Sequence, residues 1–278
     1  SNKTVKITTM DIKQIQKEKL NLLHSLGDSN YNPPFFVVLE RLNKNKPVKG
    51  IIGKGITFDS GGVTIKSGKT RHLHYMKMDK IGACYGIHLF KYMVENTDES
   101  LVAILPFTEN ILSLKNLKPG DIVKSHSGKT VEVSNTDAEG RLIVADGLSY
   151  IAQYKPKFVI DITTFTETHF ACDDYGVFFT EDLVLKKQIE KISQNLNEPI
   201  NGLPSYINKN HIQSSIADVK NSSVVCSNSY NAAMFLHEFA PNDAKWVHFD
   251  VSNEIYKNNE ELIPNGKGFL SMIETLKL

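Results

Sequence analysis

The sequence is poor in cysteine and has no long apolar run. Its three cysteines, Cys84, Cys172 and Cys226, are far apart and form no Cys-x-x-Cys pair. We interpret them as reduced thiols, which excludes a disulfide framework and favours a cytoplasmic location. No apolar stretch approaches the roughly 18–20 residues that span a bilayer, so we expect no membrane partner. The first residues, Ser1-Asn2-Lys3-Thr4, also lack the apolar segment of a signal peptide.

An excess of charge of either sign is also missing. The formal net charge is +1, which argues against nucleic acid as a partner. Hydrophobic content of 41% and charged content of 23% are ordinary for a globular protein. A chain of 278 residues can form one large core or two small ones. Because we find no internal repeat and no long linker, we expect one domain.

Apolar strand-like runs alternate with helical patterns, which favours an α/β domain. Strands are expected over residues 35–39, 48–52, 101–105, 158–162 and 246–249. Segments 121–123 and 130–133 flank Ser127-Gly128 and predict a hairpin. Helices are expected over residues 11–26, 80–94, 142–154, 183–196, 232–239 and 269–276. We expect Pro106 to close the third strand.

Two carboxylates stand two residues apart in the segment Asn135-Thr136-Asp137-Ala138-Glu139-Gly140-Arg141-Leu142. In extended backbone such side chains share a face, so Asp137 and Glu139 could bind one object, with Arg141 just beyond it. Alone, the pair is a weak signal because acidic pairs are common in surface loops. A second segment makes it informative: Gly53-Lys54-Gly55-Ile56-Thr57-Phe58-Asp59-Ser60-Gly61-Gly62, followed by Lys66 and by Met76-Lys77-Met78-Asp79.

The two segments together resemble the signatures of the leucyl aminopeptidase family, the cytosolic two-metal aminopeptidases. The likeness covers nearly the whole chain, from Asn32-Pro33-Pro34 to Trp246-Val247-His248-Phe249-Asp250. It implies an α/β fold with a central mixed β-sheet flanked by helices on both faces. We expect a single catalytic peptidase domain over residues 1–278. The N-terminal domain that family members usually carry has no room ahead of Asn32, so we expect it to be absent. Either this is a catalytic-domain fragment or the natural protein has dispensed with that domain.

The same resemblance implies a site for two metal ions. Carboxylate-rich sites hold hard or borderline divalent ions, and shared carboxylates can bridge two of them around an activated water. Lys54 and Asp79 would hold one ion, and Asp137 would hold the other. Asp59 and Glu139 would bridge both. We expect Zn²⁺ or Mn²⁺, although such ligands also accept Mg²⁺ or Co²⁺.

Two cations and three further residues complete the implied active site. Lys66 would polarise the scissile carbonyl and stabilise the oxyanion. Arg141 would hold a bicarbonate ion that serves as general base. Met76, Thr164 and Phe165 are expected to contact the substrate.

The function implied is that of a metal-dependent aminopeptidase, which releases N-terminal residues from peptides with a leucine-type preference. The substrate's free α-amine and its adjacent carbonyl would each bind one ion, which selects the first residue. Family members are hexamers, so we expect a homo-oligomer. One alternative is a family member that has lost catalysis and acts as a structural or binding subunit. A second alternative, DNA binding, has no support from the near-neutral charge.

Three departures from the family pattern concern the substrate rather than the metal ligands. The segment between Lys66 and Asp79 is longer than usual. Glu167 stands where the family has a glycine that offers its backbone to the substrate. If its carboxylate faces the cleft it would favour basic substrates, whereas facing solvent it would have little effect. The approach to the late helix reads Cys226-Ser227-Asn228-Ser229-Tyr230 instead of being rich in glycine.

Overall fold

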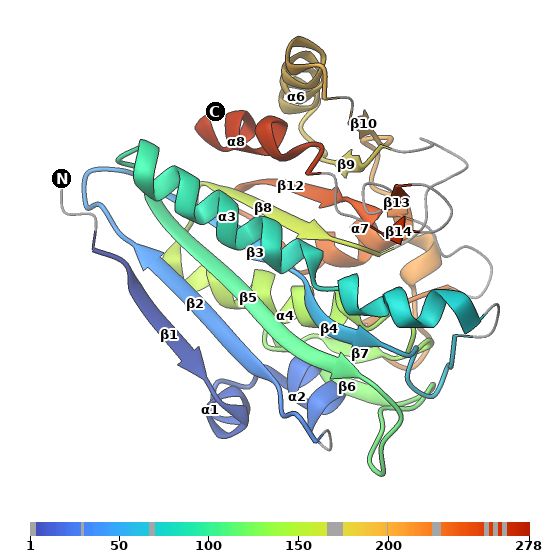
Figure 1. Cartoon of the computed structure of the whole chain (residues 1–278). Helices are drawn as coiled ribbons and strands as arrows, with labels where there is room; N and C mark the ends of the chain where they lie inside the picture. The colour runs from blue at the N-terminus through green and yellow to red at the C-terminus, as the bar shows by residue number, and fades with distance from the viewer. Residues whose placement is uncertain are drawn as a thin grey trace.

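A nine-stranded sheet forms the centre of the molecule (Figure 1). The computed structural model describes residues 4–28, 31–66, 70–165, 175–198, 200–223, 229–252, 256–257, 261–262 and 266–278. In spatial order the strands are β1 (Lys6–Met10), β2 (Phe35–Arg41), β5 (Ser100–Asn110), β3 (Val48–Gly53), β8 (Phe158–Thr163), β12 (Lys245–Asp250), β9 (Val177–Phe179) and β10 (Asn201–Gly202), with β4 (Gly55–Asp59) paired to β5. The strands β3, β4, β5, β8 and β12 run parallel, whereas β2 and β9 are antiparallel to their inner neighbours. The expected mixed sheet is confirmed.

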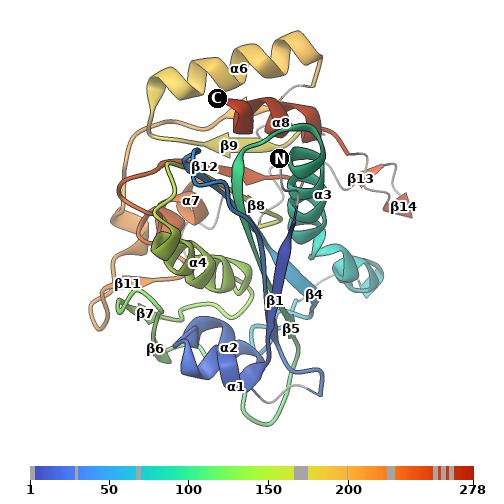
Figure 2. The same ribbon diagram turned by 90° about the vertical axis from the view of Figure 1, so that its left-hand side faces the viewer.

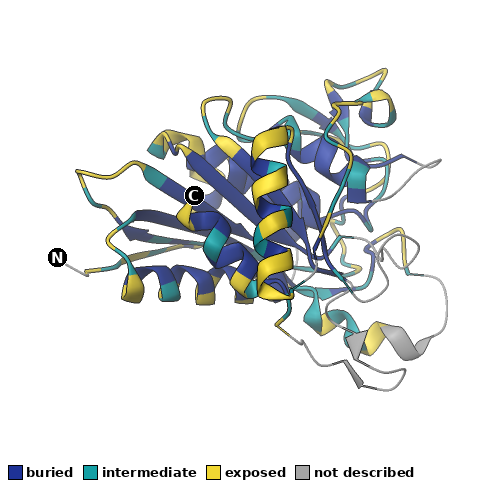
Figure 3. Cartoon of the chain, turned by 90° about the horizontal axis from the view of Figure 1, so that it is seen from above, coloured by how far each residue is buried: buried dark blue, intermediate teal, exposed yellow. Residues whose placement is uncertain are grey.

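Helices cover both faces of this sheet (Figures 1 and 2). One apolar core joins the sheet to α3 (Ile81–Asn96), α6 (Leu183–Leu196) and α8 (Phe269–Lys277). The other core joins it to α1 (Ile12–Lys17), α2 (Asn21–Gly27), α4 (Gly140–Ile151) and α7 (Ser229–His237). Because successive strand residues point to opposite faces, Ile51 and Ile52 lie in different cores. Figure 3 shows buried strands between helices whose outer faces are exposed.

The other elements are short. The antiparallel hairpin of β6 (Ile122–Lys124) and β7 (Thr130–Glu132) was expected, and Gly128 in its turn has a φ of +92°. The remaining elements are β11 (Val219–Lys220), the pair β13 (Tyr256–Lys257) and β14 (Glu261–Leu262), and the 3-10 helices η1 (Thr70–Met78), η2 (Ala152–Tyr154) and η3 (Asn210–Ile212). Within the described ranges, no helix is both long and apolar enough to cross a membrane.

Two expected elements differ from the structure. The helix expected over residues 11–26 is two helices, because Lys19 adopts a left-handed φ of +58° between them. The N–H groups of Lys19 and Leu20 donate to the carbonyls of Gln16 and Ile15, which ends α1 in a Schellman motif. The strand expected to end at Pro106 instead continues to Asn110. Pro106 is tolerated there because the neighbour of β5 changes from β3 to β4 at this point.

Five parallel strands end at one edge of the sheet. At this edge β4 ends in Asp59, β5 in Asn110 and β12 in Asp250, while Lys54 follows β3 and Thr164 follows β8. In open α/β sheets, ligands bind outside the carboxyl ends of the strands. The topology therefore brings polar and charged residues of distant segments together at this edge.

Candidate metal centre and active site

Carboxylates from two segments meet at this edge. One oxygen each from Asp59, Asp137 and Glu139 lie within 4.8 Å of one another. Asp59 and Glu139 are buried, and Asp137 is half-buried. The expectation that Asp137 and Glu139 converge is met, but the reason given for it was wrong. Their backbone is not extended: Asp137 lies in a turn, and Glu139, which precedes the first residue of α4, already has helical φ and ψ.

Lys54 lies among buried acceptors. Its Nζ is 2.7 Å from Asp79 Oδ1 and 3.6 Å from Glu139 Oε1, and it also donates to the carbonyl of Thr164. Burial lowers the pKa of this amine, but Asp79, Glu139 and Asp59 together outweigh burial and raise the pKa above its usual value. Lys54 therefore carries its proton in the metal-free chain.

Lys66 connects two carboxylates in the same way. Its Nζ lies 2.7 Å from Asp59 Oδ2 and 2.6 Å from Asp137 Oδ1. Burial lowers its pKa, yet the carboxylates of Asp59, Glu139 and Asp137 outweigh this and raise it. The loop that carries Lys66 is fixed by a reciprocal contact, in which the N–H of Thr64 donates to Thr136 Oγ1 and the N–H of Thr136 donates to Thr64 Oγ1.

Burial dominates the ionisation of the carboxylates. Burial and, second to it, the neighbouring Asp59 raise the pKa of Glu139 to about 8, while Lys54 opposes them. Burial also raises the pKa of Asp79 to about 6 against the effect of Lys54, and it raises the pKa of Asp137. Among the described residues, Asp79 Oδ2 is buried and finds no hydrogen-bond partner. Several convergent oxygens and one buried oxygen without a donor fit divalent metal ions, which take oxygen ligands.

Arg141 lies in the first turn of α4 and is buried. One of its terminal N–H groups donates to the carbonyl of Asn221 at 2.8 Å, and its guanidinium carbon lies 5.6 Å from the ring centre of Phe165. Burial lowers its pKa to about 10, although Glu139 and Asp250 oppose this. Within the described part of the chain, its Nε has no hydrogen-bond partner. A buried donor of this kind is suited to an anion.

The three residues expected to contact substrate lie around these groups. Thr164 donates from Oγ1 to Asp79 Oδ1 at 2.7 Å, so its hydroxyl orients a carboxylate of the cluster. The Phe165 ring stacks on His248 at 5.5 Å and has Lys54 Nζ 5.4 Å from its centre. Met76 is half-buried on η1, which packs against β4. Glu167 lies outside the described residues.

Two buried asparagines at the site were not singled out from the sequence. Asn110 donates to both Asp59 and Glu139. Asn221 holds the loop before α4, since its side-chain oxygen accepts from the N–H of Ser134 and its amide donates to the carbonyl of Asn135. A lone asparagine has no spacing signal in a sequence. Asn110 gave no indication from its position either, because the strand that it ends was expected to close at Pro106.

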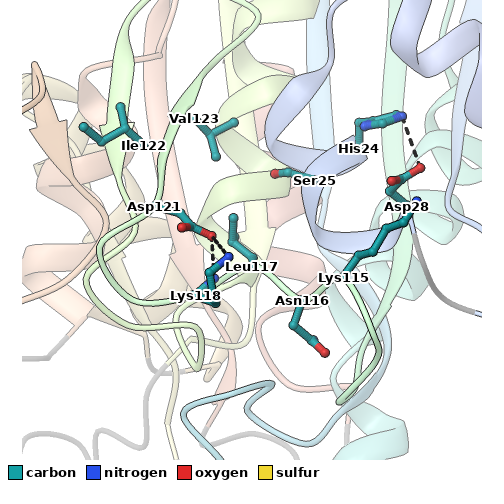
Figure 4. Close-up of a pocket in the computed structure, with 10 residues that line it drawn as sticks. All are labelled: His24, Ser25, Asp28, Lys115, Asn116, Leu117, Lys118, Asp121, Ile122 and Val123. Atoms are coloured by element: carbon teal, nitrogen blue, oxygen red, sulfur yellow. Dashed lines mark hydrogen bonds and ion pairs between the residues drawn. The ribbon is translucent and has the colours of Figure 1, made fainter.

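A surface pocket of about 400 Å³ lies apart from this cluster, between α2 and the segment that joins β5 to β6 (Figure 4). Its two carboxylates already have neighbours: His24 Nε2 is 3.7 Å from Asp28, and Lys118 Nζ is 3.0 Å from Asp121. None of its lining residues belongs to the acidic cluster, so we assign it no part in the chemistry. The lining residues are His24, Ser25, Asp28, Lys115, Asn116, Leu117, Lys118, Asp121, Ile122 and Val123.

Comparison with known proteins identifies the family. The sequence model of the cytosol aminopeptidase family, catalytic domain, matches residues 1–273. The chain belongs to the cytosol aminopeptidase family. This confirms the family expected from the two sequence segments.

Relatives match nearly the whole of this chain, but the chain covers only part of their length. A probable cytosol aminopeptidase of Protochlamydia amoebophila is 36% identical over 98% of this chain, which covers 56% of that protein. The cytosol aminopeptidase of Encephalitozoon cuniculi is 32% identical over 93% of this chain and 54% of its own length. The crystal structure of a cytosol aminopeptidase from Coxiella burnetii superimposes with a TM-score of 0.90 at 26% identity, over 98% of this chain and 61% of that one. The chain therefore spans little more than half the length of its curated relatives.

Proposed function

We propose that this chain is the catalytic domain of a metal-dependent aminopeptidase, formed by residues 1–278. The observation that carries the proposal is the convergence of Asp59, Asp137 and Glu139 within 4.8 Å, in a member of the cytosol aminopeptidase family. Its substrates would be peptides, cleaved after the first residue with a leucine-type preference.

Two divalent ions would be held by the residues of this cluster. Lys54 and Asp79 would serve one ion, Asp137 the other, and Asp59 and Glu139 both. Zn²⁺ or Mn²⁺ is expected, and Mg²⁺ or Co²⁺ suits the same ligands. When bound, such ions supply Lewis-acid polarisation of a carbonyl and lower the pKa of a water molecule. The amine of Lys54 must lose its proton to act as a ligand, which adjacent dications favour.

Lys66 would act on the substrate carbonyl. Its side chain is 30% exposed, whereas that of Lys54 is 3% exposed, so Lys66 is the lysine that solvent and substrate can reach. As an ammonium it can donate to a carbonyl oxygen and continue to donate as negative charge develops there. It is therefore suited to stabilise an oxyanion.

Arg141 would bind a bicarbonate ion that accepts a proton from the attacking water. Its buried Nε, which lacks a hydrogen-bond partner in the described ranges, supports this assignment. Thr164 and Phe165 would shape the adjoining substrate site, with Met76 at the pocket for the first side chain. We also propose a cytoplasmic homo-oligomer, a hexamer, which light scattering at micromolar protein would test. A monomeric mass would count against it.

The function is tested with metal-depleted protein and a chromogenic leucyl anilide. Turnover should return with Mn²⁺ or Zn²⁺, and the N-acetylated anilide, whose α-amine is blocked, should not react. If ions bind but no leucyl or other aminoacyl reporter is cleaved, the alternative of a structural or binding subunit is favoured instead. Comparing Glu167→Gly with the unmodified chain on leucyl and arginyl reporters then shows whether Glu167 selects basic substrates.

A further inference from the structure

Asn110 makes an unusual set of contacts at the end of β5. Its side-chain nitrogen donates to Asp59 Oδ1 at 2.7 Å, to the carbonyl of Thr136 at 3.0 Å and to Glu139 Oε2 at 3.2 Å. The backbone carbonyl of Thr136 can only accept, so the nitrogen of the amide is the atom that faces these oxygens. The residue is 1% exposed. One neutral group therefore holds both carboxylates to which a bridging role is assigned.

The backbone fixes where this amide lies. Asn110 is the strand partner of Asp59 in the parallel pair β4–β5, and its carbonyl accepts from both the N–H and the hydroxyl of Ser60. Gly62, with a φ of +65°, approaches the other end of the amide: a Cβ there would lie 2.8 Å from Asn110 Oδ1. The amide is therefore enclosed from two sides and cannot turn away without moving the loop that leads to Lys66.

The contacts divide the oxygens of each carboxylate between the amide and a lysine. Asp59 accepts a hydrogen bond from Asn110 at Oδ1 and forms an ion pair with Lys66 at Oδ2. Glu139 accepts from Asn110 at Oε2, and its Oε1 faces the ammonium of Lys54. An amide donates hydrogen bonds without adding a charge that would repel a metal ion. It can thus orient two like-charged groups and leave one oxygen of each on the side of the cations.

We propose that Asn110 is a positioning residue for metal binding, which sets the spacing and orientation of Asp59 and Glu139. The proposal rests on the proposed function only in that divalent ions bind at these carboxylates. Partners of metal ligands typically change metal affinity by about 10–100-fold when they are removed. The same range is expected here.

The test compares Asn110→Leu, which keeps the size of the side chain and removes its donors, with Thr108→Val. Thr108 is a buried residue on the same face of the same strand, and its hydroxyl donates to the backbone carbonyl of Glu109. Mn²⁺ binding is measured by titration calorimetry, and the melting temperature is measured with and without Mn²⁺. Asn110→Leu should lower Mn²⁺ affinity by about 10–100-fold and reduce the Mn²⁺-induced rise in melting temperature. Thr108→Val should change neither.

Several results would overturn the proposal. Equal Mn²⁺ affinity in Asn110→Leu and the unmodified chain, with a lower melting temperature in both states, would mean that Asn110 only supports the fold. The proposed function would then stand. An unmodified chain that binds no Mn²⁺ or Zn²⁺ would overturn both. If Asn110→Leu does not fold, a metal-loaded crystal structure of the unmodified chain decides: the amide must remain in contact with Asp59 and Glu139.

Discussion

Replacing Lys66 tests two roles that its position allows: stabilising the oxyanion, and competing with metal ions for the carboxylates. We predict that Lys66→Met lowers turnover by about a hundredfold or more, the usual effect of losing one oxyanion donor. Metal affinity should stay the same or rise. The Nζ of Lys66 lies 2.7 Å from Asp59 and 2.6 Å from Asp137, two of the proposed metal ligands. The ammonium thus occupies space between carboxylates that a dication would share, and its removal takes away a competitor.

The metal-free protein should lose stability in the same variant. A hydrogen bond to a charged group contributes about 1.5–3 kcal/mol, and Lys66 makes two such contacts. Because its side chain is 30% exposed, solvent screening reduces their sum, and we expect a net loss of about 2–3 kcal/mol. For a chain of 278 residues this lowers the melting temperature by roughly 3–5 °C.

Scanning calorimetry with and without saturating Mn²⁺, Mn²⁺ titration and a leucyl reporter assay check these expectations. The rise in melting temperature on adding Mn²⁺ should be larger in Lys66→Met than in the unmodified chain. Lys118→Met, which removes a largely exposed lysine 3.0 Å from Asp121, is the control and should alter nothing. A tenfold loss of Mn²⁺ affinity would show that Lys66 assists the ions instead of competing with them. Unchanged turnover would show that it does not act on the carbonyl.

Three further predictions follow from burial at and near the site. Burial raises the pKa of Glu139 to about 8 and that of Asp79 to about 6, above their ordinary values of 4.5 and 3.8. As pH rises, the unfolded chain therefore loses these protons before the folded chain does. The melting temperature of the metal-free protein should then fall between about pH 4 and pH 8. Mn²⁺ affinity should rise over the same range, because the ligands must be ionised to bind the ion. Asp146, also buried, accepts three backbone N–H groups, two of them from the first turns of α2. Asp146→Asn, whose amide accepts with one oxygen only, should lower the free energy of unfolding by about 1–3 kcal/mol in urea titrations and leave Mn²⁺ affinity unchanged. Gly140→Ala would place a Cβ 2.2 Å from Lys54 Cε and 2.8 Å from its Nζ, so the amine must move. Mn²⁺ stoichiometry, measured by elemental analysis after dialysis, should then fall, and an unaltered stoichiometry would exclude Lys54 as a ligand.

The parts of the fold that could be predicted are those whose pattern reflects burial. Strands β3 and β8 are buried on both faces, so their sequences are mostly apolar, with Lys49 and Asp161 as the charged exceptions. Helix α6 has the predicted bounds because its apolar residues recur with helical spacing. The break between α1 and α2 was missed because it depends on the left-handed backbone of Lys19, for which lysine gives no signal. The extension of β5 past Pro106 depends on a change of neighbouring strand, which is a tertiary property.

The site could be predicted to the extent that it lies in contiguous segments. Asp137 and Glu139 are close in sequence, and the structure brings Asp59 to them. Asn110 and Asn221 could not be found in this way, because each acts through contacts with a segment distant in sequence. Their roles follow from strand order, which places the ends of separate strands beside one another. Sequence motifs identify the groups that do chemistry, whereas the residues that orient them require the fold.

The two lysines account for how this many carboxylates can be buried together before any ion binds. An isolated buried carboxylate costs several kcal/mol, and like charges close together add to that cost. Lys66 lies against Asp59 and Asp137, and Lys54 lies against the other two carboxylates, so each ammonium neutralises part of one pair. Incoming dications would have to take over this role, which requires Lys54 to release its proton and Lys66 to withdraw. Proton release on metal binding and the unimpaired metal affinity of Lys66→Met would therefore have one origin, the competition between ammonium groups and metal ions for the same oxygens.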